Sequence, residues 1–371
     1  MSNEKVRQEL TERKYRALKS NFFKKGVLIG GMSGLLYGVY SAFLTLGMAR
    51  GVWADWYGAN TAGLSAFVIA YMLCALGSSI NDTVSGVFSL INVIAKGKFK
   101  DFLRTMRTKP GWIMVLAALF GGPIANTAYV IGLQMAGSMA APVSALCVAI
   151  GAILGRVLYG QKLSMRMIGG IVLCFVATVL LGGTALSAVN PQVLLGCVIA
   201  FVAALGWGIE GCVAGYGTAM IDYEIGITIR QCTSGIINTL VLVPLFAVLA
   251  GNIGLAPSLL GQAWTSAPAM VFFVISGFCA MLTYSLWYKG NSMCGAALGM
   301  ALNGTYSFFT PLCCWILLGL ICREPGWAVT PIGWISAVIM FVGIVLIAIN
   351  PFEFLKKKTR ARKQEHANAA G

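Results

Sequence analysis

Residues 203–215 read AALGWGIEGCVAG and lie inside an apolar window that extends from residue 193 to residue 216. The stretch contains one carboxylate, Glu210, three residues after Trp207. A helix needs about 20 mostly apolar residues to cross a bilayer, which this window supplies. An ionised carboxylate in hydrocarbon costs at least about 2.5 kcal/mol, so Glu210 is predicted to face the interior of a helical bundle or a water-filled cavity.

The same kind of window recurs along the whole chain of 371 residues, which has a mean hydropathy of +0.81 and 11% charged residues. The predicted spans are residues 25–47, 61–80, 111–136, 139–159, 166–186, 193–216, 228–250, 268–288, 293–320 and 330–350. Several glycine pairs have the GxxxG spacing of closely packed membrane helices, namely Gly34 and Gly38, Gly151 and Gly155, and Gly211 and Gly215. We therefore expect an all-α integral membrane protein with ten transmembrane helices.

The net charge of +15 is concentrated at one predicted side of the membrane. With a cytoplasmic N-terminus, all but two of the 27 Lys and Arg residues fall on the cytoplasmic side; the exceptions are Arg50 and Arg323. We expect cytoplasmic tails at 1–24 and 351–371 that contact anionic lipid headgroups, in a cell inner membrane. No basic fold interleaved with aromatics accompanies the charge, which argues against a nucleic-acid partner.

Several polar residues are assigned to the ends of predicted spans. The cluster at residues 78–83 resembles a helix stop followed by an N-cap, with Asp82 as the cap at the interface and a separate surface helix after it. The alternative is that residues 81–96 extend the second span. A further set falls at cytoplasmic helix ends, where solvation or mutual pairing would account for it: Arg156, Asp222, Glu224 and Arg230.

A weak internal repeat relates the two halves of the chain. The aligned pairs are Tyr37 with Trp207, Gly38 with Gly208, Tyr40 with Glu210, Tyr129 with Tyr284, Ser138 with Ser292, and Met139 with Met293. Each half, residues 25–186 and residues 193–350, has five predicted spans. Because five is odd, the second half is inverted relative to the first, the arrangement in which transport sites form at the repeat interface.

With these features the sequence resembles the drug/metabolite transporter superfamily, and in particular its EamA-like ten-helix members. The resemblance rests on Tyr37-Gly38, Trp207-Gly208 and residues 128–183, which carry a tyrosine, small residues, a proline and then a glycine-rich helix. Two positions depart from the family pattern: Gln161 replaces an acid, and Ala296 stands opposite Pro142, with Pro311 deeper in the ninth span. The resemblance implies a ten-helix fold and transport of a small solute.

The candidate site is the face shared by Glu210 and Trp207, together with Tyr37 and Tyr40 on the repeat-related helix. A carboxylate among aromatic rings suits an organic cation, through charge pairing and cation–π contacts; the plainer alternatives are aromatic packing and a hydrogen-bonded glutamate. Secondary candidates could orient a polar solute or bond neighbouring helices: Asn126, Tyr129, Tyr284, Trp287, Asn303 and Tyr306.

These patterns predict a secondary active transporter that moves a small metabolite or an organic cation by alternating access, with Glu210 as a candidate proton-coupling group. A carrier of a neutral or sugar-like solute is the alternative within transport, and a non-transporting membrane subunit or sensor is the alternative outside it. An enzyme is disfavoured because no membrane histidine and no second deep carboxylate is predicted. We expect no metal or other cofactor, since the sole histidine is His366 in the tail. Homo-oligomerisation stays open.

Overall fold

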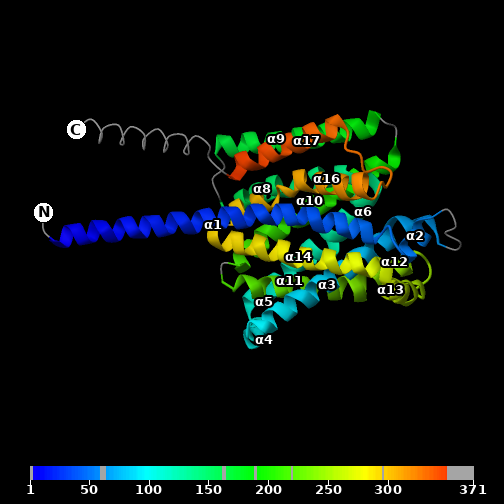
Figure 1. Ribbon diagram of the computed structural model, residues 1–371, viewed down its shortest axis with the longest axis horizontal. Helices are drawn as coiled ribbons and strands as arrows, with labels where there is room; N and C mark the ends of the chain where they lie inside the picture. Colours follow the sequence, from blue (N-terminus) through cyan, green and yellow to red (C-terminus); the bar gives the residue numbers. More distant parts are fainter. Residues whose placement is uncertain are drawn as a thin grey trace.

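The computed structural model describes residues 3–58, 64–160, 164–187, 190–218, 220–294 and 296–348, and every regular element in these ranges is helical. The α-helices are α1 (Asn3–Gly47), α2 (Val52–Tyr57), α3 (Leu73–Ala95), α4 (Phe99–Thr105), α5 (Lys109–Leu119), α6 (Thr127–Ala136), α7 (Ala140–Ser144), α8 (Cys147–Tyr159), α9 (Met165–Ser187), α10 (Pro191–Thr218), α11 (Tyr223–Ile237), α12 (Val243–Leu249), α13 (Leu255–Thr265), α14 (Ala267–Cys294), α15 (Ala296–Asn303), α16 (Tyr306–Cys314) and α17 (Pro331–Ala348). Most helices pack side by side in one bundle (Figure 1).

Short segments of other helical types interrupt or precede these helices. Four are π-helical, namely η1 (Val68–Met72), η2 (Phe120–Asn126), η4 (Asn238–Leu242) and η5 (Trp315–Ile321), and η3 (Gly137–Met139) is a 3₁₀ turn. Pro123 lies inside η2 and has no N–H to donate to the preceding turn. Such widened turns bend a helix and free its backbone for other partners.

Within the described ranges, six helical stretches are long and apolar enough to cross a membrane. They are Asn21–Gly47, Lys109–Ser144, Pro191–Gly215, Tyr223–Leu249, Ala267–Met293 and Gly299–Ile321. Three shorter apolar stretches accompany them: Cys147–Leu158, Met165–Leu180 and Pro331–Ile347. The chain is therefore an all-α, multi-pass membrane protein. α1 begins at Asn3, so its helix includes most of the expected N-terminal tail and projects beyond the bundle (Figure 1); the expected C-terminal tail lies outside the described residues.

The prediction of a helix stop at residues 78–83 is wrong. α3 continues from Leu73 to Ala95, and Asp82 lies in its middle with no exposed surface. Three residues of the cluster bond to side chains of other segments: Asn81 accepts from the Ser276 hydroxyl at 2.7 Å, Asp82 accepts from Asn126, and the Thr83 and Thr239 hydroxyls lie 3.2 Å apart. Ser79 bonds back to the Leu76 carbonyl oxygen of its own helix. The polar residues therefore do not end the helix, and residues 81–95 continue it.

The helices pack closely through glycines. α1 packs along α14 and α16, α10 along α6 and α8, α3 on α11, and α9 on α17. A methyl group on Gly38 would lie 2.7 Å from the main-chain carbonyl carbon of Phe309, and one on Gly208 would lie 2.7 Å from Ile150 Cγ2. Alanine at either position would therefore separate two helices. The close approach predicted from the GxxxG spacing is confirmed for Gly34 too, where a methyl group would lie 2.1 Å from Thr305 Oγ1.

Candidate functional site

An aromatic cluster fills the centre of the bundle and is built from residues of α1, α6, α10, α14 and α16. The Tyr37 ring stacks on Tyr306, with centroids 4.2 Å apart, and lies 4.5 Å from Tyr40 and 5.8 Å from Trp207. Tyr129 lies 5.2 Å from Trp207. The rings are all buried. The structure thus brings together aromatic residues that the sequence placed on different spans.

A small cavity of about 10 Å³ lies within this cluster, room for about one water molecule. Its lining residues are Tyr37, Cys147, Trp207, Tyr284, Trp287, Met300, Asn303 and Tyr306. Among the described residues, two buried polar atoms of this lining have no hydrogen-bond partner, the Tyr37 hydroxyl and Trp287 Nε1. A polar ligand or water in the cavity would therefore find two free hydrogen-bonding groups in its lining. Unpaired buried groups also occur elsewhere in the described bundle, such as the Ser336 hydroxyl, so the combination of free polar groups and enclosed space is what distinguishes this place.

Two other predicted residues join neighbouring helices instead of standing free in the cavity. Asn303 Oδ1 accepts a hydrogen bond from the Ser33 hydroxyl at 3.1 Å, and the hydroxyls of Tyr306 and Ser144 lie 3.0 Å apart. Both pairs tie helices of one half of the bundle to helices of the other. The interhelical role that the sequence left open is therefore the one that Asn303 adopts here.

Glu210 is fully buried and pairs with Arg230, which is also fully buried. Arg230 Nε donates to Glu210 Oε1 at 2.8 Å, and Arg230 Nη2 lies 3.4 Å from Oε2. Arg230 Nη1 donates to Gln231 Oε1. The assignment of Arg230 to a solvated cytoplasmic helix end is wrong, because its side chain points into the bundle and completes an ion pair there.

The backbone of η2 holds this ion pair against the aromatic cluster. The Gly121 carbonyl oxygen accepts from Arg230 Nη2 at 3.0 Å and from Trp207 Nε1 at 2.9 Å. A methyl group on Gly121 would lie 1.8 Å from Glu210 Oε2, so only glycine fits beside the carboxylate. The Arg230 guanidinium also lies 4.0 Å from the centre of the Tyr284 ring, a cation–π contact.

Asp82 is a second deep carboxylate, which corrects the expectation that Glu210 is alone. Asn126 Nδ2 donates to Asp82 Oδ1 at 2.8 Å, while Asn238 Nδ2 donates to Oδ2 at 2.9 Å and the Ser234 hydroxyl donates to Oδ2 as well. No Lys or Arg nitrogen of the described residues lies within ion-pair distance of Asp82. Its partners are all neutral.

Two hydrogen bonds and one cation–π contact connect the two carboxylate sites through Asn126 and Tyr284, which the sequence did single out. The Tyr284 hydroxyl donates to Asn126 Oδ1 at 3.0 Å, and Asn126 in turn donates to Asp82. The ring of the same tyrosine carries the Arg230 guanidinium on its face. Asn126 and Tyr284 therefore bridge the Asp82 site and the Glu210 ion pair.

Asp222 and Glu224 pair with two lysines at one end of the bundle, and not with Arg156 or Arg230 as mutual pairing within the predicted set would require. Lys98 Nζ lies 2.9 Å from Asp222 Oδ2 and 2.6 Å from Glu224 Oε2, and Lys96 contacts the other oxygen of Glu224. The Glu224 carboxylate raises the pKa of Lys98. Arg156 Nη1 donates to the Gly160 carbonyl oxygen at 3.4 Å. The lysine contacts join the C-terminal end of α3 to the N-terminal end of α11, outside the aromatic cluster, whereas the Arg156 contact stays at the end of α8.

Sequence reasoning missed Asp82 and Arg230, although a signal for both is present. Polar residues recur at helical spacing along α3, at Ser78, Asp82, Ser85 and Ser89, and along α11 into the start of η4, at Arg230, Ser234 and Asn238. Two polar stripes of this kind that face each other satisfy their polar groups across a helix interface. Their matching periods could have predicted that α3 and α11 pack with a buried polar seam.

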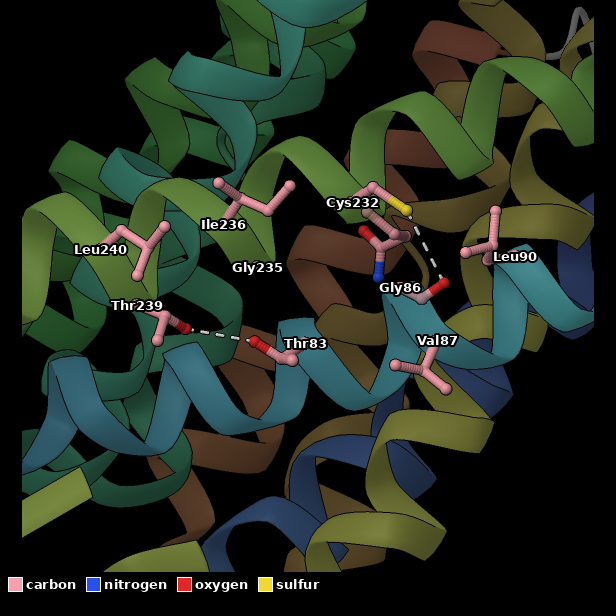
Figure 2. A pocket seen from close by; sticks show the side chains of 10 residues that line it. Thr83, Gly86, Val87, Leu90, Cys232, Gly235, Ile236, Thr239 and Leu240 are labelled. Carbon is pink, nitrogen blue, oxygen red and sulfur yellow. Dashed lines mark hydrogen bonds between the residues drawn. The ribbon is translucent and has the colours of Figure 1, made fainter. Parts of the chain in front are cut away.

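A larger groove of about 300 Å³ runs along the outer side of the same two helices and differs in character (Figure 2). The surface that its lining exposes is almost entirely apolar, and two hydrogen bonds cross it: the hydroxyls of Thr83 and Thr239 lie 3.2 Å apart, and Cys232 Sγ lies 3.8 Å from the Gly86 carbonyl oxygen. Val87 and Leu240 on its rim are more than half exposed. The groove suits the apolar environment of a bilayer and is not part of the candidate site.

The fold has counterparts among solved structures. In a crystal structure of a protein that is 19% identical to this chain, the similarity covers 87% of this chain and 97% of that one, with a TM-score of 0.53. The sequence matches no family model and no curated protein. The likeness extends over nearly the whole of the solved chain and shows a shared fold.

Proposed function

We propose that the protein is a secondary transporter of a small polar metabolite, in the manner that the resemblance to drug/metabolite transporters implies. The observation that carries the proposal is the small aromatic cavity in the middle of a membrane bundle, with two unpartnered buried donors in its lining. Each unpaired buried polar atom costs about 1–3 kcal/mol, and a solute that bonds to both atoms would recover that cost on binding. A membrane subunit or sensor would need no enclosed aromatic cavity at this position.

We also propose that ten spans form two inverted halves, and the helix pairings support this division. α1 packs along α14 and α16, and α10, the equivalent helix of the second half, packs along α6 and α8. α3 pairs with α11 and α9 with α17, each helix with its own counterpart. Gly38 and Gly208, aligned in the repeat, make the corresponding close approaches. The cavity lies where the halves meet, as expected for alternating access with a site at the repeat interface.

The state of Glu210 favours a neutral, sugar-like or other polar solute over an organic cation. Arg230 occupies the carboxylate and also covers one face of Tyr284, so the charge that would attract a cation is already neutralised. The cavity instead offers aromatic faces together with the hydroxyl of Tyr37 and the N–H of Trp287. Aromatic rings with a few placed polar groups are a usual lining for small-molecule sites. The organic cation is the second candidate.

The test combines ligand binding with transport. Purified protein would be unfolded thermally with sugars, nucleosides, amino acids and quaternary amines, because a ligand that binds the native state raises the unfolding midpoint. Any solute that shifts the midpoint would then be measured for uptake into proteoliposomes. We expect a neutral polar solute to shift the midpoint and to be taken up.

A matched pair of variants locates the site. Tyr37→Phe removes only an unpartnered hydroxyl, so it should leave basal stability intact and abolish the ligand shift. Tyr71→Phe, on a tyrosine that packs on Phe67 away from the cavity, should leave both intact. A shift only with quaternary amines would select the second candidate, and a protein that neither binds nor moves any solute of the panel would contradict a transporter.

A further inference from the structure

The buried charges in the described part of the bundle do not balance. Four charged side chains are buried there, and one of them, Glu224, pairs with Lys96 and Lys98 at a helix end. The remaining three are two carboxylates, Asp82 and Glu210, and one guanidinium, Arg230. Their formal sum is one negative charge. Arg230 is in direct contact with Glu210 and acts on Asp82 only from beyond ion-pair distance, so Asp82 is the carboxylate that has no cation in contact with it.

We propose that Asp82 is the proton-binding site of this bundle, and that it takes up one proton from solution to become a neutral carboxylic acid. Uptake would remove the excess negative charge, and release would restore it. An unmatched charge in a low-dielectric interior is costly, which gives the proton a reason to bind. The role of this proton in coupling rests on the proposed transport function, whereas its binding to Asp82 does not.

The partners of Asp82 can serve both forms of the carboxyl group. The Ser234 hydroxyl donates a hydrogen bond to Oδ2 here. After rotating, it can instead accept a hydrogen bond from the O–H of a protonated Asp82, since a hydroxyl is both donor and acceptor. Asn238 donates through Nδ2, while its buried Oδ1 has no partner among the described residues. Turning this amide over would present Oδ1 to a protonated Asp82. Neither change requires movement of the backbone.

The titratable and charged groups around Asp82 favour it over Glu210 as the proton acceptor. Arg230 of α11 is hydrogen-bonded to Glu210 of α10 and acts on Asp82 only through space, at longer range. Tyr284 of α14 is hydrogen-bonded to Asn126 of η2, which in turn donates to Asp82. On α3 itself, the neighbouring polar groups are neutral serine and asparagine side chains. A proton on Glu210 would break an ion pair, whereas a proton on Asp82 breaks none.

A proton fits this site better than a metal ion. Hard cations such as Ca²⁺ and Mg²⁺ take six or more oxygen ligands. In the part of the chain that the structure describes, no three His, Cys, Asp or Glu side chains gather at one place. Asp82 and the spare oxygen of Asn238 are too few ligands to replace the hydration shell of such an ion.

The experiment is infrared difference spectroscopy of the full-length protein in lipid, recorded as the pH is lowered. A carboxyl group that takes up a proton gains a C=O stretching band that the carboxylate lacks. We expect one such band from the bundle interior, lost in Asp82→Asn and kept in Glu210→Gln. Because either variant could misfold, wild-type protein labelled with ¹³C at the aspartate side-chain carboxyl carbon gives a second test, in which the band should shift.

Each outcome decides the proposal. A band that shifts with the aspartate label and disappears in Asp82→Asn supports it. A band that does not shift with the aspartate label, or that disappears in Glu210→Gln, overturns the proposal. The absence of any buried carboxyl band over the pH range in which the protein stays folded also overturns it. The measurement needs no substrate, so it is independent of the transport assay. If transport fails and the Asp82 band is seen, the proposed function is wrong and the proton site is supported. If transport succeeds and no such band is seen, the protein is a transporter that does not bind a proton at Asp82.

Discussion

Asp82 and Glu210 are both fully buried carboxylates, yet the protein surrounds them in opposite ways. Glu210 has an arginine partner and lies against a glycine that leaves no room for anything else. Asp82 accepts hydrogen bonds from two asparagines and a serine, all neutral. The first arrangement holds its charge permanently, and the second tolerates a change of charge.

This difference separates a structural use of a membrane carboxylate from a switchable one. A buried ion pair is costly to break, because removing one partner leaves the other charge unmatched. A carboxylate whose hydrogen-bond partners are all neutral leaves no charged partner uncompensated when it becomes neutral. Changes at the Glu210 site should therefore cost more than changes at Asp82, and the following predictions run from the largest effect to the smallest.

Arg230→Met should be the most destabilising single change. It leaves Glu210 buried without a cation, a loss of about 3–5 kcal/mol of unfolding free energy. Adding Glu210→Gln to this variant removes the stranded charge, so the double variant should recover much of the loss. Thermal or denaturant unfolding in one detergent measures both. If the double variant were as unstable as the sum of the single changes, the two residues would not act as a pair.

Gly121→Ala should lower the free energy of unfolding by about 1–3 kcal/mol, the usual cost of overpacking. The new methyl group would overlap the Glu210 carboxylate and push α10 away from η2. Gly169→Ala is the matched control, because a methyl group there meets nothing within 4 Å and alanine is the better helix former. Equal midpoints for the two variants would show that η2 does not fix the position of Glu210.

Asp82→Asn should cost about 1 kcal/mol near neutral pH, since it disturbs neutral hydrogen bonds without stranding a charge. Glu210→Gln, an equally small change in shape, should cost more because it leaves Arg230 unpaired. The comparison of their unfolding midpoints tests the contrast between the two sites directly. A larger loss for Asp82→Asn would reverse the assignment of structural and switchable roles.

Lys98→Met should have the smallest effect, about 0.5–1 kcal/mol, because its ion pairs with Asp222 and Glu224 lie at a partly exposed helix end. The Glu224 carboxylate raises the pKa of Lys98 in the folded protein. Its contribution is therefore complete below the unfolded lysine value of about 10.4 and disappears only as the pH rises through the higher folded value.

The check is the stability difference between Lys98→Met and wild type at about pH 7 and about pH 9, which should be the same. Lys100→Met is the control, two residues further on in the first turn of α4, since Lys100 is exposed and makes no ion pair with any described residue. If the difference in unfolding free energy between Lys98→Met and wild type disappeared below pH 9, the ion pairs would not raise the pKa of Lys98.

The all-helical bundle was predictable because a bilayer imposes long apolar windows, and a sequence shows these directly. The aromatic cluster was predictable in part, since Tyr37 and Trp207 occupy the same place in the two halves of the weak repeat. Asp82 and Arg230 were misassigned for one reason. A charged residue near a predicted span end was read as solvated, whereas in three dimensions each found its partners on a neighbouring helix.

Other contacts could not be predicted from the sequence at all. The double hydrogen bond to the Gly121 carbonyl oxygen depends on the π-helical turn η2 and on the angle at which α10 and α11 approach it. Neither depends on a side-chain pattern. The same holds for the Arg230 guanidinium on the Tyr284 ring, which joins residues from two helices with no sequence relation.

The cavity among the aromatic rings has room for about one water molecule, which has a consequence for how the protein responds to compression. Any conformation that admits a metabolite must enclose a larger space than this closed one, and water fills that space when no metabolite occupies it. Hydrostatic pressure acts on empty internal volume, because the state of smaller total volume is favoured. The closed form has little empty space at this place, so pressure should shift the balance between the closed and widened forms only weakly.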